Sequence, residues 1–212
     1  VRMPVKDFAD EVSRDTPTPG GGSVAALAGA LGGALASMVA NLWQDKVESA
    51  EAASELLEAA KTAQRVKDEL IVAVDEDTNA FNAYMEARRL PSRTAAEQAE
   101  RERRMQDGLK AAVRVPYRTA RAAYEAMQAA WTVVRHGNVS SITDGAVGAQ
   151  TAYAGLRGGI WNALINLNDI TDRDFVDEMR GKCDALLKDA GLLLEQVTTH
   201  VDGRLAGCTE KK

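Results

Sequence analysis

Residues 16–43 constrain the fold most, because turn-forming residues lead directly into a long apolar stretch, TPTPGGGSVAALAGALGGALASMVANLW. Pro17 and Pro19 oppose helix upstream and favour an extended chain. Gly20, Gly21 and Gly22 permit backbone angles that other residues avoid, and they let a ligand approach the main chain closely. We therefore expect a backbone-lined corner that precedes a rigid, buried helix.

Ser23 is a favourable N-cap for that helix. The first turn of a helix carries unpaired N–H groups and a partial positive charge, which suit an anion or a carbonyl oxygen. A helix-start loop without a ligand is the alternative interpretation. The glycines do not form a nucleotide-binding P-loop, because no GxxxxGK[ST] pattern is present.

The composition favours a single all-helical domain over residues 1–212. Of the 212 residues, 45% are hydrophobic but only 5% are aromatic, so alanine supplies much of the apolar content. Abundant alanine, few prolines and long uninterrupted runs are typical of helical proteins. The net charge of −5 argues against a general nucleic-acid-binding protein, which usually carries a basic face.

The chain shows no basic segment followed by an apolar one, so a signal peptide is not expected. Cys183 and Cys208 have no metal-ligand spacing, and free thiols in a cytoplasmic protein are the simplest explanation. Residues 23–43 are long enough to span a membrane. We prefer a bundle core, because Ser37 and Asn41 interrupt the stretch.

Gly29, Gly32 and Gly33 give this helix a face of small residues, which favours close approach by another helix, either in the bundle core or at a subunit interface. A subunit interface is an attractive place for that face, because the rest of one chain would cover so smooth a helix with difficulty. We therefore expect a homodimer.

Apolar periodicity predicts further helices on both sides of this stretch. An up-and-down bundle of about six or seven helices is the expected architecture. Thr94 and Glu97 form a capping box, and Pro116 is expected at the start or a kink of a later helix. The highly charged residues 95–107 are expected to form a solvated helical face. The predicted helices cover residues 4–15, 23–43, 51–89, 95–107, 116–135, 144–167 and 172–205.

Several polar residues interrupt apolar helical patterns. Asp77 lies in VAVDEDTNAF, and Asn162 and Asn166 share a helix face because they are four residues apart. Asn41 and Arg157 also interrupt apolar runs. Burying such groups without partners costs free energy, so they must pair, face water or line a polar pocket. Internal pairing is the simpler interpretation for each residue alone, but together they make a polar cavity plausible.

Five blocks resemble the family of formiminotetrahydrofolate cyclodeaminases and methenyltetrahydrofolate cyclohydrolases. They are the stretch from Thr16 to Leu42, VDEDTNAFNAYMEARRLP, LKAAVRVP, GNVSSITD and AYAGLRGGIWNALINLNDITD. The resemblance covers residues 5–200 approximately. It implies an all-α bundle that dimerises and binds a folate near the glycine corner.

The resemblance also implies the chemistry. A cyclodeaminase closes a ring on the one-carbon unit of tetrahydrofolate and expels ammonia, whereas a cyclohydrolase opens the methenyl cation with water. Each reaction needs a general acid or base and anchors for the pterin and the glutamate tail. Asp144 is the candidate for proton transfer, and Asp77 for proton transfer or charge stabilisation. The candidate substrate-binding residues are Gly20, Gly21, Gly22, Ser23, Asn41, Asn138, Arg157, Asn162 and Asn166. Neither reaction calls for a metal or redox cofactor.

The sequence leaves the activity open. INLNDITD looks more like the cyclodeaminases and AYAGLR more like the cyclohydrolases, and we favour the cyclodeaminase. A non-catalytic folate-binding module or scaffold is the alternative from another class. Retention of the triple glycine with Asp77 and Asp144 argues against that alternative.

Overall fold

The computed structural model describes residues 2–43, 45–47, 49–137 and 139–209. These residues form six α-helices and one short 3₁₀ helix, and no strand occurs among them. The all-α bundle predicted from the sequence is therefore confirmed. The elements are α1 (Val5–Val12), α2 (Gly21–Trp43), α3 (Ala50–Arg88), α4 (Ala95–His136), η1 (Val139–Ser141), α5 (Ile142–Ile165) and α6 (Arg173–Thr209).

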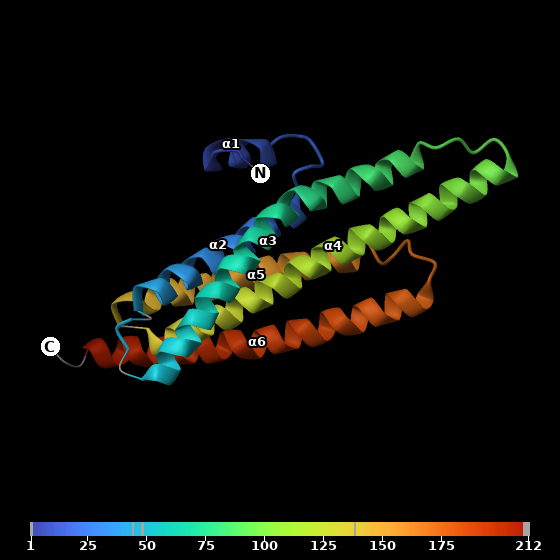
Figure 1. Ribbon diagram of the computed structural model, residues 1–212. Coiled ribbons are helices and arrows are strands. Elements are labelled where there is room, and N and C mark those ends of the chain that lie inside the picture. Colours follow the sequence, from blue (N-terminus) through green and yellow to red (C-terminus); the bar gives the residue numbers. More distant parts are fainter. Residues whose placement is uncertain (1, 44, 48, 138, 210–212) are drawn as a thin grey trace.

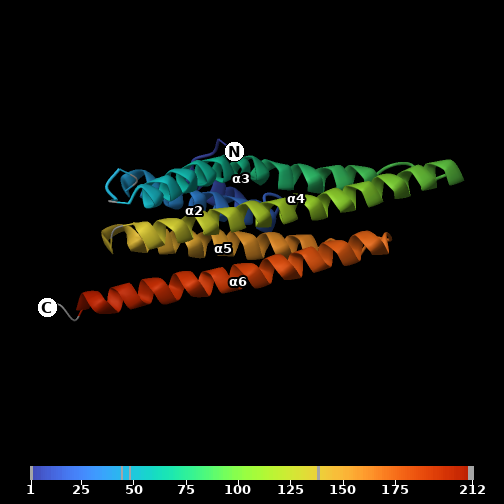
Figure 2. The same cartoon turned by 60° about the horizontal axis from the view of Figure 1, so that its bottom comes forward.

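Helices α2 to α5 form the body of the bundle, and α6 lies along the side formed by α4 and α5 (Figures 1 and 2). Helix α1 sits apart above this body and buries only Phe8 of its own residues, against Ala26 and Val74. The hairpin of α3 and α4 extends beyond the N-terminal end of α2. Helix α3 has 39 residues, so it is about 58 Å long at the α-helical rise.

The small residues of α2 bring three neighbouring helices into close contact. A side chain at Gly29 would meet Leu70 of α3 at 3.0 Å, and one at Gly32 would meet the Gly148 carbonyl of α5 at 2.6 Å. The glycine face is therefore covered by the same chain, and the sequence-based assignment of this face to a subunit interface is wrong. Helix α2 is long and apolar enough to cross a membrane, but 61% of its most apolar window is buried in the bundle, as in the core helix of a soluble protein.

Helix α4 runs without a break from Ala95 to His136 and contains Pro116 in its interior. The prediction that Pro116 begins a helix is therefore wrong. Proline has no N–H group, so it cannot bond to the carbonyl four residues earlier. That carbonyl belongs to Ala112, and Asn166 of the α5 C-cap donates to it at 3.0 Å. A side chain from α5 thus satisfies the group that proline leaves unpaired.

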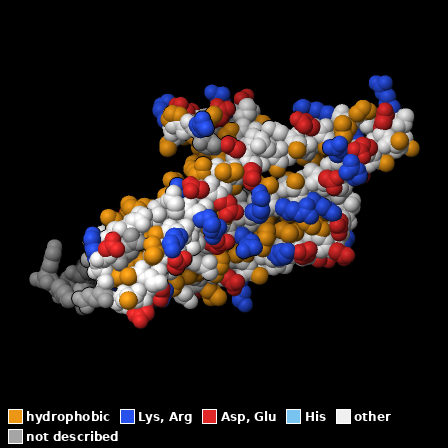
Figure 3. Space-filling model, in the orientation of Figure 1, with side chains coloured by type: hydrophobic (Ala, Val, Ile, Leu, Met, Phe, Trp, Pro, Cys, Tyr) orange, Lys and Arg blue, Asp and Glu red, His pale blue; other side chains and the backbone are white. Residues whose placement is uncertain are grey.

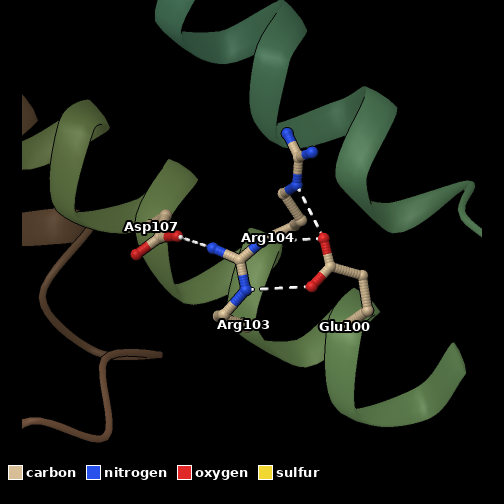
Figure 4. Close-up of polar contacts among 4 residues, drawn as sticks. All are labelled: Glu100, Arg103, Arg104 and Asp107. Atoms are coloured by element: carbon tan, nitrogen blue, oxygen red, sulfur yellow. Dashed lines mark hydrogen bonds and ion pairs between the residues drawn. The ribbon is translucent and has the colours of Figure 1, made fainter. Parts of the chain in front are cut away.

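The charged first turns of α4 form the solvated surface that the sequence predicted. Thr94 and Glu97 make the predicted capping box. Figure 4 shows Glu100 accepting from Arg103 and Arg104, while Arg103 also donates to Asp107. The two guanidinium groups lower the pKa of Glu100 to about 2. Figure 3 shows acidic and basic side chains interspersed over this end of the hairpin, so it presents no uniform charge to a partner.

The outward faces of α2 and α5 carry exposed apolar side chains, which we call the apolar stripe. Trp161 is 60% exposed and Ile165 is 65% exposed. Exposed apolar patches of this kind commonly mark interaction surfaces. The stripe comprises Val24, Leu31, Met38 and Leu42 of α2 and Val147, Trp161 and Ile165 of α5.

Candidate functional site

A pocket of about 210 Å³ opens where the glycine corner meets α3, α4 and the end of α5. It brings together the triple glycine, Asp77, Asn162 and Asn166, all of which the sequence singled out. The Thr18–Pro19 peptide beside it is cis. The lining residues are Pro17, Thr18, Gly20, Gly21, Gly22, Asp77, Ala80, Phe81, Tyr84, Leu109, Ala112, Asn162, Ile165 and Asn166.

Gly22 and Asp77 approach each other so closely that any side chain at position 22 would displace the Asp77 carboxyl group. A β-carbon on Gly22 would lie 2.1 Å from Asp77 Oδ1 and 2.4 Å from Asp77 Cγ. None of the described glycines has a positive φ. The sequence argument from permissive backbone angles is therefore wrong at this corner. What glycine at position 22 provides is room for the carboxyl group of Asp77 in its present position.

Asp77 is half-buried, and burial raises the pKa of its carboxyl above the ordinary value of 3.8. Hydrogen bonds from the Ser23 hydroxyl and backbone N–H oppose that rise. A carboxyl group beside a helix N-terminus is well placed, because the N–H groups of the first turn can donate to it. The pocket thus holds a carboxyl group that binds its proton more tightly than a solvated aspartate does.

Ser23 takes a different place from the one predicted. Helix α2 begins at Gly21, so Ser23 lies inside the first turn and is not the N-cap. Its side chain is 0% exposed and is absent from the pocket lining. The hydroxyl lies 2.9 Å from the Val74 carbonyl and 3.3 Å from Asp77 Oδ2. Ser23 therefore contacts the carboxyl group from behind, and direct contact with a ligand in this pocket is not its role.

Asn162 and Asn166 form the wall of the pocket opposite Asp77. Asn166 donates to the Ala112 and Asn162 carbonyls at 3.0 and 2.8 Å, so both of its N–H groups are used. Asn162 donates one N–H to the Gly158 carbonyl at 2.8 Å. Three groups remain for a ligand: the side-chain carbonyl of Asn166, the second side-chain N–H of Asn162 and the side-chain carbonyl of Asn162.

The apolar wall of the pocket escaped sequence analysis. Phe81 and Tyr84 of α3 face Leu109 of α4 and Ile165 of α5 across the pocket. At helical spacing, such residues look like ordinary core positions. Phe81 and Tyr84 lie near Asp77 along the chain and Ile165 lies near Asn162, whereas Leu109 lies near neither.

Two predicted residues lie at the opposite end of the bundle. Asp144 is in the first turn of α5. Asn162 follows about five turns later on the same helix, which corresponds to about 27 Å along the helix axis. Asn41 is near the end of α2, exposed, and donates to Ser37 at 3.4 Å. Within one chain the structure therefore does not bring Asp144 or Asn41 into the pocket with Asp77. A carboxylate in a first turn also stabilises its own helix.

Arg157 is a further predicted residue outside the pocket. Its guanidinium lies between the Tyr153 and Trp161 rings, 5.8 and 5.0 Å from their centroids, beside the apolar stripe. Its Nε is buried and has no hydrogen-bond partner among the described residues. Asn138 lies outside the described residues.

Cys183 is buried in the core, and desolvation raises the pKa of its thiol to about 11. The Cys208 side chain lies outside the described part of the structure. Within the described ranges, no three His, Cys, Asp or Glu side chains are grouped so that they could hold a metal ion.

Residues 4–185 match the model of the formiminotransferase-cyclodeaminase family. The chain belongs to this family. It is 35% identical over 201 residues to a methenyltetrahydrofolate cyclohydrolase of Methylorubrum extorquens, covering 95% of this chain and 97% of that protein. It is 37% identical over 190 residues to the formimidoyltransferase-cyclodeaminase of Gallus gallus, covering 90% of this chain.

The chain spans only 35% of the length of that Gallus gallus protein. Among solved structures, it resembles a formiminotetrahydrofolate cyclodeaminase from Thermotoga maritima, with a TM-score of 0.80 and 27% identity. That alignment covers 98% of both chains. The family that the sequence motifs indicated is therefore confirmed.

Proposed function

We propose that this protein is a formiminotetrahydrofolate cyclodeaminase that binds the reacting end of its folate substrate in the pocket at the glycine corner. The observation that carries the proposal is the half-buried carboxyl group of Asp77, which lines the pocket and lies against Gly22. The Thermotoga maritima cyclodeaminase, which has the same fold over almost its whole length, supports this activity.

The size of the pocket supports partial burial of the substrate. Its volume of about 210 Å³ is smaller than that of pockets that enclose a drug-sized ligand. A folate would therefore place its pterin ring and one-carbon unit inside, with the remainder of the molecule outside. Phe81 and Tyr84 offer apolar surface to the ring, and Asn162 and Asn166 match its hydrogen-bonding edge.

Asp77 supplies the proton transfers of the cyclodeaminase reaction. The N10 nitrogen attacks the formimino carbon and a C–N bond forms, while the C=N double bond of the formimino group becomes single as its nitrogen takes a proton. N10 then loses its own proton. The bond from that carbon to the formimino nitrogen then breaks, and the nitrogen leaves as ammonia after protonation. A carboxyl group whose pKa is raised by burial can donate this proton nearer neutral pH than a solvated aspartate can. No metal or cofactor takes part in these steps.

Methenyltetrahydrofolate cyclohydrolase is the alternative. The similarity to the Methylorubrum extorquens enzyme, which covers nearly the whole of both chains, favours it. In that reaction Asp77 would accept a proton from the water that attacks the methenyl carbon. The same pocket serves both reactions, because both form or consume the methenyl cation.

The deciding experiment follows the absorbance of the methenyl chromophore from both directions. Appearance from formiminotetrahydrofolate with release of ammonia establishes the cyclodeaminase. Disappearance of methenyltetrahydrofolate without use of the formimino compound establishes the cyclohydrolase. Asp77→Asn should abolish either activity, whereas the control Asp75→Asn, at an exposed position on the same helix, should retain it.

Thermal stabilisation separates both enzymes from a non-catalytic scaffold. A ligand at one hundred times its dissociation constant adds about 2.7 kcal/mol to the stability of a protein that binds it. A scaffold should show no stabilisation by either folate and no turnover.

We further propose that the protein acts as a homodimer through the apolar stripe. Exposed side chains recur every seven residues at Val24, Leu31 and Met38, as expected of a helix face that packs on another helix. The stripe continues to Ile165 at the pocket edge.

A two-fold axis through the middle of the α5 part of the stripe would run near residue 156. It would place residue 144 of one copy opposite residue 168 of the other, within one turn of Asn166. In such a dimer, Asp144 of the partner subunit would reach the pocket that it cannot reach within its own chain.

Subunit complementation tests this arrangement. Asp77→Asn and Asp144→Asn are each expected to be inactive. Mixed and re-equilibrated, they should recover about a quarter of the wild-type activity, because half of the dimers are mixed and each mixed dimer has one intact site. Sedimentation should show a dimer that Leu31→Glu dissociates. A monomeric wild type, or no recovery on mixing, would refute the shared site.

We infer a cytoplasmic location, supported by the buried, unpaired Cys183. Cell fractionation checks the location. The absence of membrane and nucleic-acid partners stays a prediction.

A further inference from the structure

The buried hydroxyl of Ser23 joins the two helices that hold the catalytic carboxyl group. Ser23 lies in the first turn of α2, and its Oγ reaches the Val74 carbonyl at 2.9 Å and Asp77 Oδ2 at 3.3 Å, both on α3. Thr78 Oγ1 is 3.5 Å away. These contacts bridge more than fifty positions in the sequence and lie behind the pocket lining.

A serine hydroxyl has one proton, so it can donate to only one of these oxygens at a time. When it donates to the Val74 carbonyl, its lone pairs face Asp77 Oδ2, which is favourable only if that oxygen carries a proton. When Asp77 is ionised, the better arrangement turns the Ser23 proton onto Oδ2, because a bond to a charged acceptor is stronger. The hydroxyl therefore has two positions, one for each protonation state of the carboxyl group.

We propose that Ser23 is the positioning residue for Asp77, and that its hydroxyl turns between the Val74 carbonyl and Asp77 Oδ2 as the carboxyl group gains and loses its proton. This inference rests on the proposed role of Asp77 in catalysis. It assigns to Ser23 a function other than contact with substrate. The Ser23 hydroxyl contacts Oδ2, which leaves Oδ1, the oxygen nearest to a β-carbon placed on Gly22, for the substrate.

Ser23 makes the main polar contribution to the pKa of Asp77, because few other polar groups surround that carboxyl group. Among the described lining residues, the other titratable group is the Tyr84 phenol, on the same helix. Helices α2, α4 and α5 face Asp77 with the uncharged residues Gly22, Leu109, Ala112, Asn162, Ile165 and Asn166. Glu11 of α1 and Asp75 line a separate cavity on the other side of the segment around Pro19.

The test measures the ionisation of Asp77 directly, without substrate. Carboxyl groups are labelled with ¹³C-aspartate, the Asp77 signal is assigned by its loss in Asp77→Asn, and its titration is followed by NMR. The Ser23 hydrogen bond lowers the pKa of Asp77, so Ser23→Ala should move the titration to higher pH. Ser37→Ala is the matched control, because Ser37 is also buried on α2 but lies near its other end.

Kinetics supply the second measurement. The pH dependence of kcat should shift to higher pH in Ser23→Ala while KM for the folate stays unchanged, because Ser23 does not line the pocket. Ser23→Cys, which retains a weaker donor, should give an intermediate shift, and it replaces the alanine variant if that variant does not fold. A titration of Asp77 that is identical in Ser23→Ala and Ser37→Ala overturns the proposal. A shifted titration in a protein that turns over neither folate supports Ser23 as the positioning residue and refutes the proposed function instead.

Discussion

Replacing Gly22 by alanine should separate activity from stability. The new β-carbon would lie 2.1 Å from Asp77 Oδ1, 2.6 Å from Oδ2 and 2.4 Å from Cγ, so the carboxyl group must leave its position. These atoms are the end of a side chain, which can rotate. Overpacking lowers the free energy of unfolding by about 1–3 kcal/mol, and the higher helix propensity of alanine raises it by about 0.8–1.0 kcal/mol. The net loss of about 0–2 kcal/mol lowers Tm by at most about 8 °C in a domain of this size.

The expected loss of activity is much larger. A positioned acid or base contributes about 10²–10⁴-fold to the rate, so kcat in the methenyl assay should fall at least about 100-fold. Gly191→Ala is the control for helix propensity, because a β-carbon there meets nothing within 4 Å. In an Asp77→Ala background the clash disappears, and Gly22→Ala should then stabilise the protein. A folded Gly22→Ala variant with nearly wild-type kcat would refute the proposed role of Asp77.

Three further variants test the packing and ionisation around the pocket. Asp77→Asn should be more stable than the wild type at pH 7. Burial raises the pKa of Asp77 in the folded state, so the stability that its protonated carboxyl contributes is complete below pH 3.8 and is lost as pH rises through the folded-state pKa. In scanning calorimetry, the difference in stability between Asp77→Asn and the wild type should therefore vanish in acid. An equal difference at pH 3 and pH 7 would contradict this. Asn166→Ala should lower the free energy of unfolding in urea by about 1–3 kcal/mol, because the Ala112 carbonyl loses its hydrogen-bond donor. The loss should be smaller in a Pro116→Ala background, where the restored N–H can bond to that carbonyl. Equal losses in both backgrounds would argue against this pairing. Gly155→Ala should destabilise by about 3 kcal/mol, because its β-carbon would lie 2.6 Å from the Ala25 carbonyl; Gly181→Ala, with nothing within 4 Å, should be neutral or slightly stabilising by the same thermal unfolding measurement.

Local patterns predicted most of the helices, but they divided α4 into two. Periodicity and the capping box placed α3 and the start of α4 within one residue of their bounds in the structure. Pro116 was predicted at the start or a kink of a helix, and the first of these alternatives is wrong because local rules favour proline in the first turn. The compensation that keeps it inside α4 comes from Asn166, whose position depends on the tertiary fold.

Which residues line the pocket depends on the relative direction of the helices, and local sequence does not encode that direction. Helices α2 and α5 run in opposite directions, so the start of α2 meets the end of α5. Asn162 therefore faces the glycine corner, and Asp144 lies far from it. Ser23 was misplaced for a related reason, because its contacts are on α3, more than fifty residues later in the chain.

The burial of α2 has a consequence for synthesis of the protein. Its most extensive partners include α5, which begins only at Ile142, whereas α2 ends at Trp43. At ordinary rates of translation, this stretch of membrane-like hydrophobicity stays without its final cover for about 10 s. During that interval, the nascent chain presents a segment that chaperones and signal-sequence receptors recognise by hydrophobicity. Productive folding therefore depends on α3 and α4 shielding α2 before α5 leaves the ribosome.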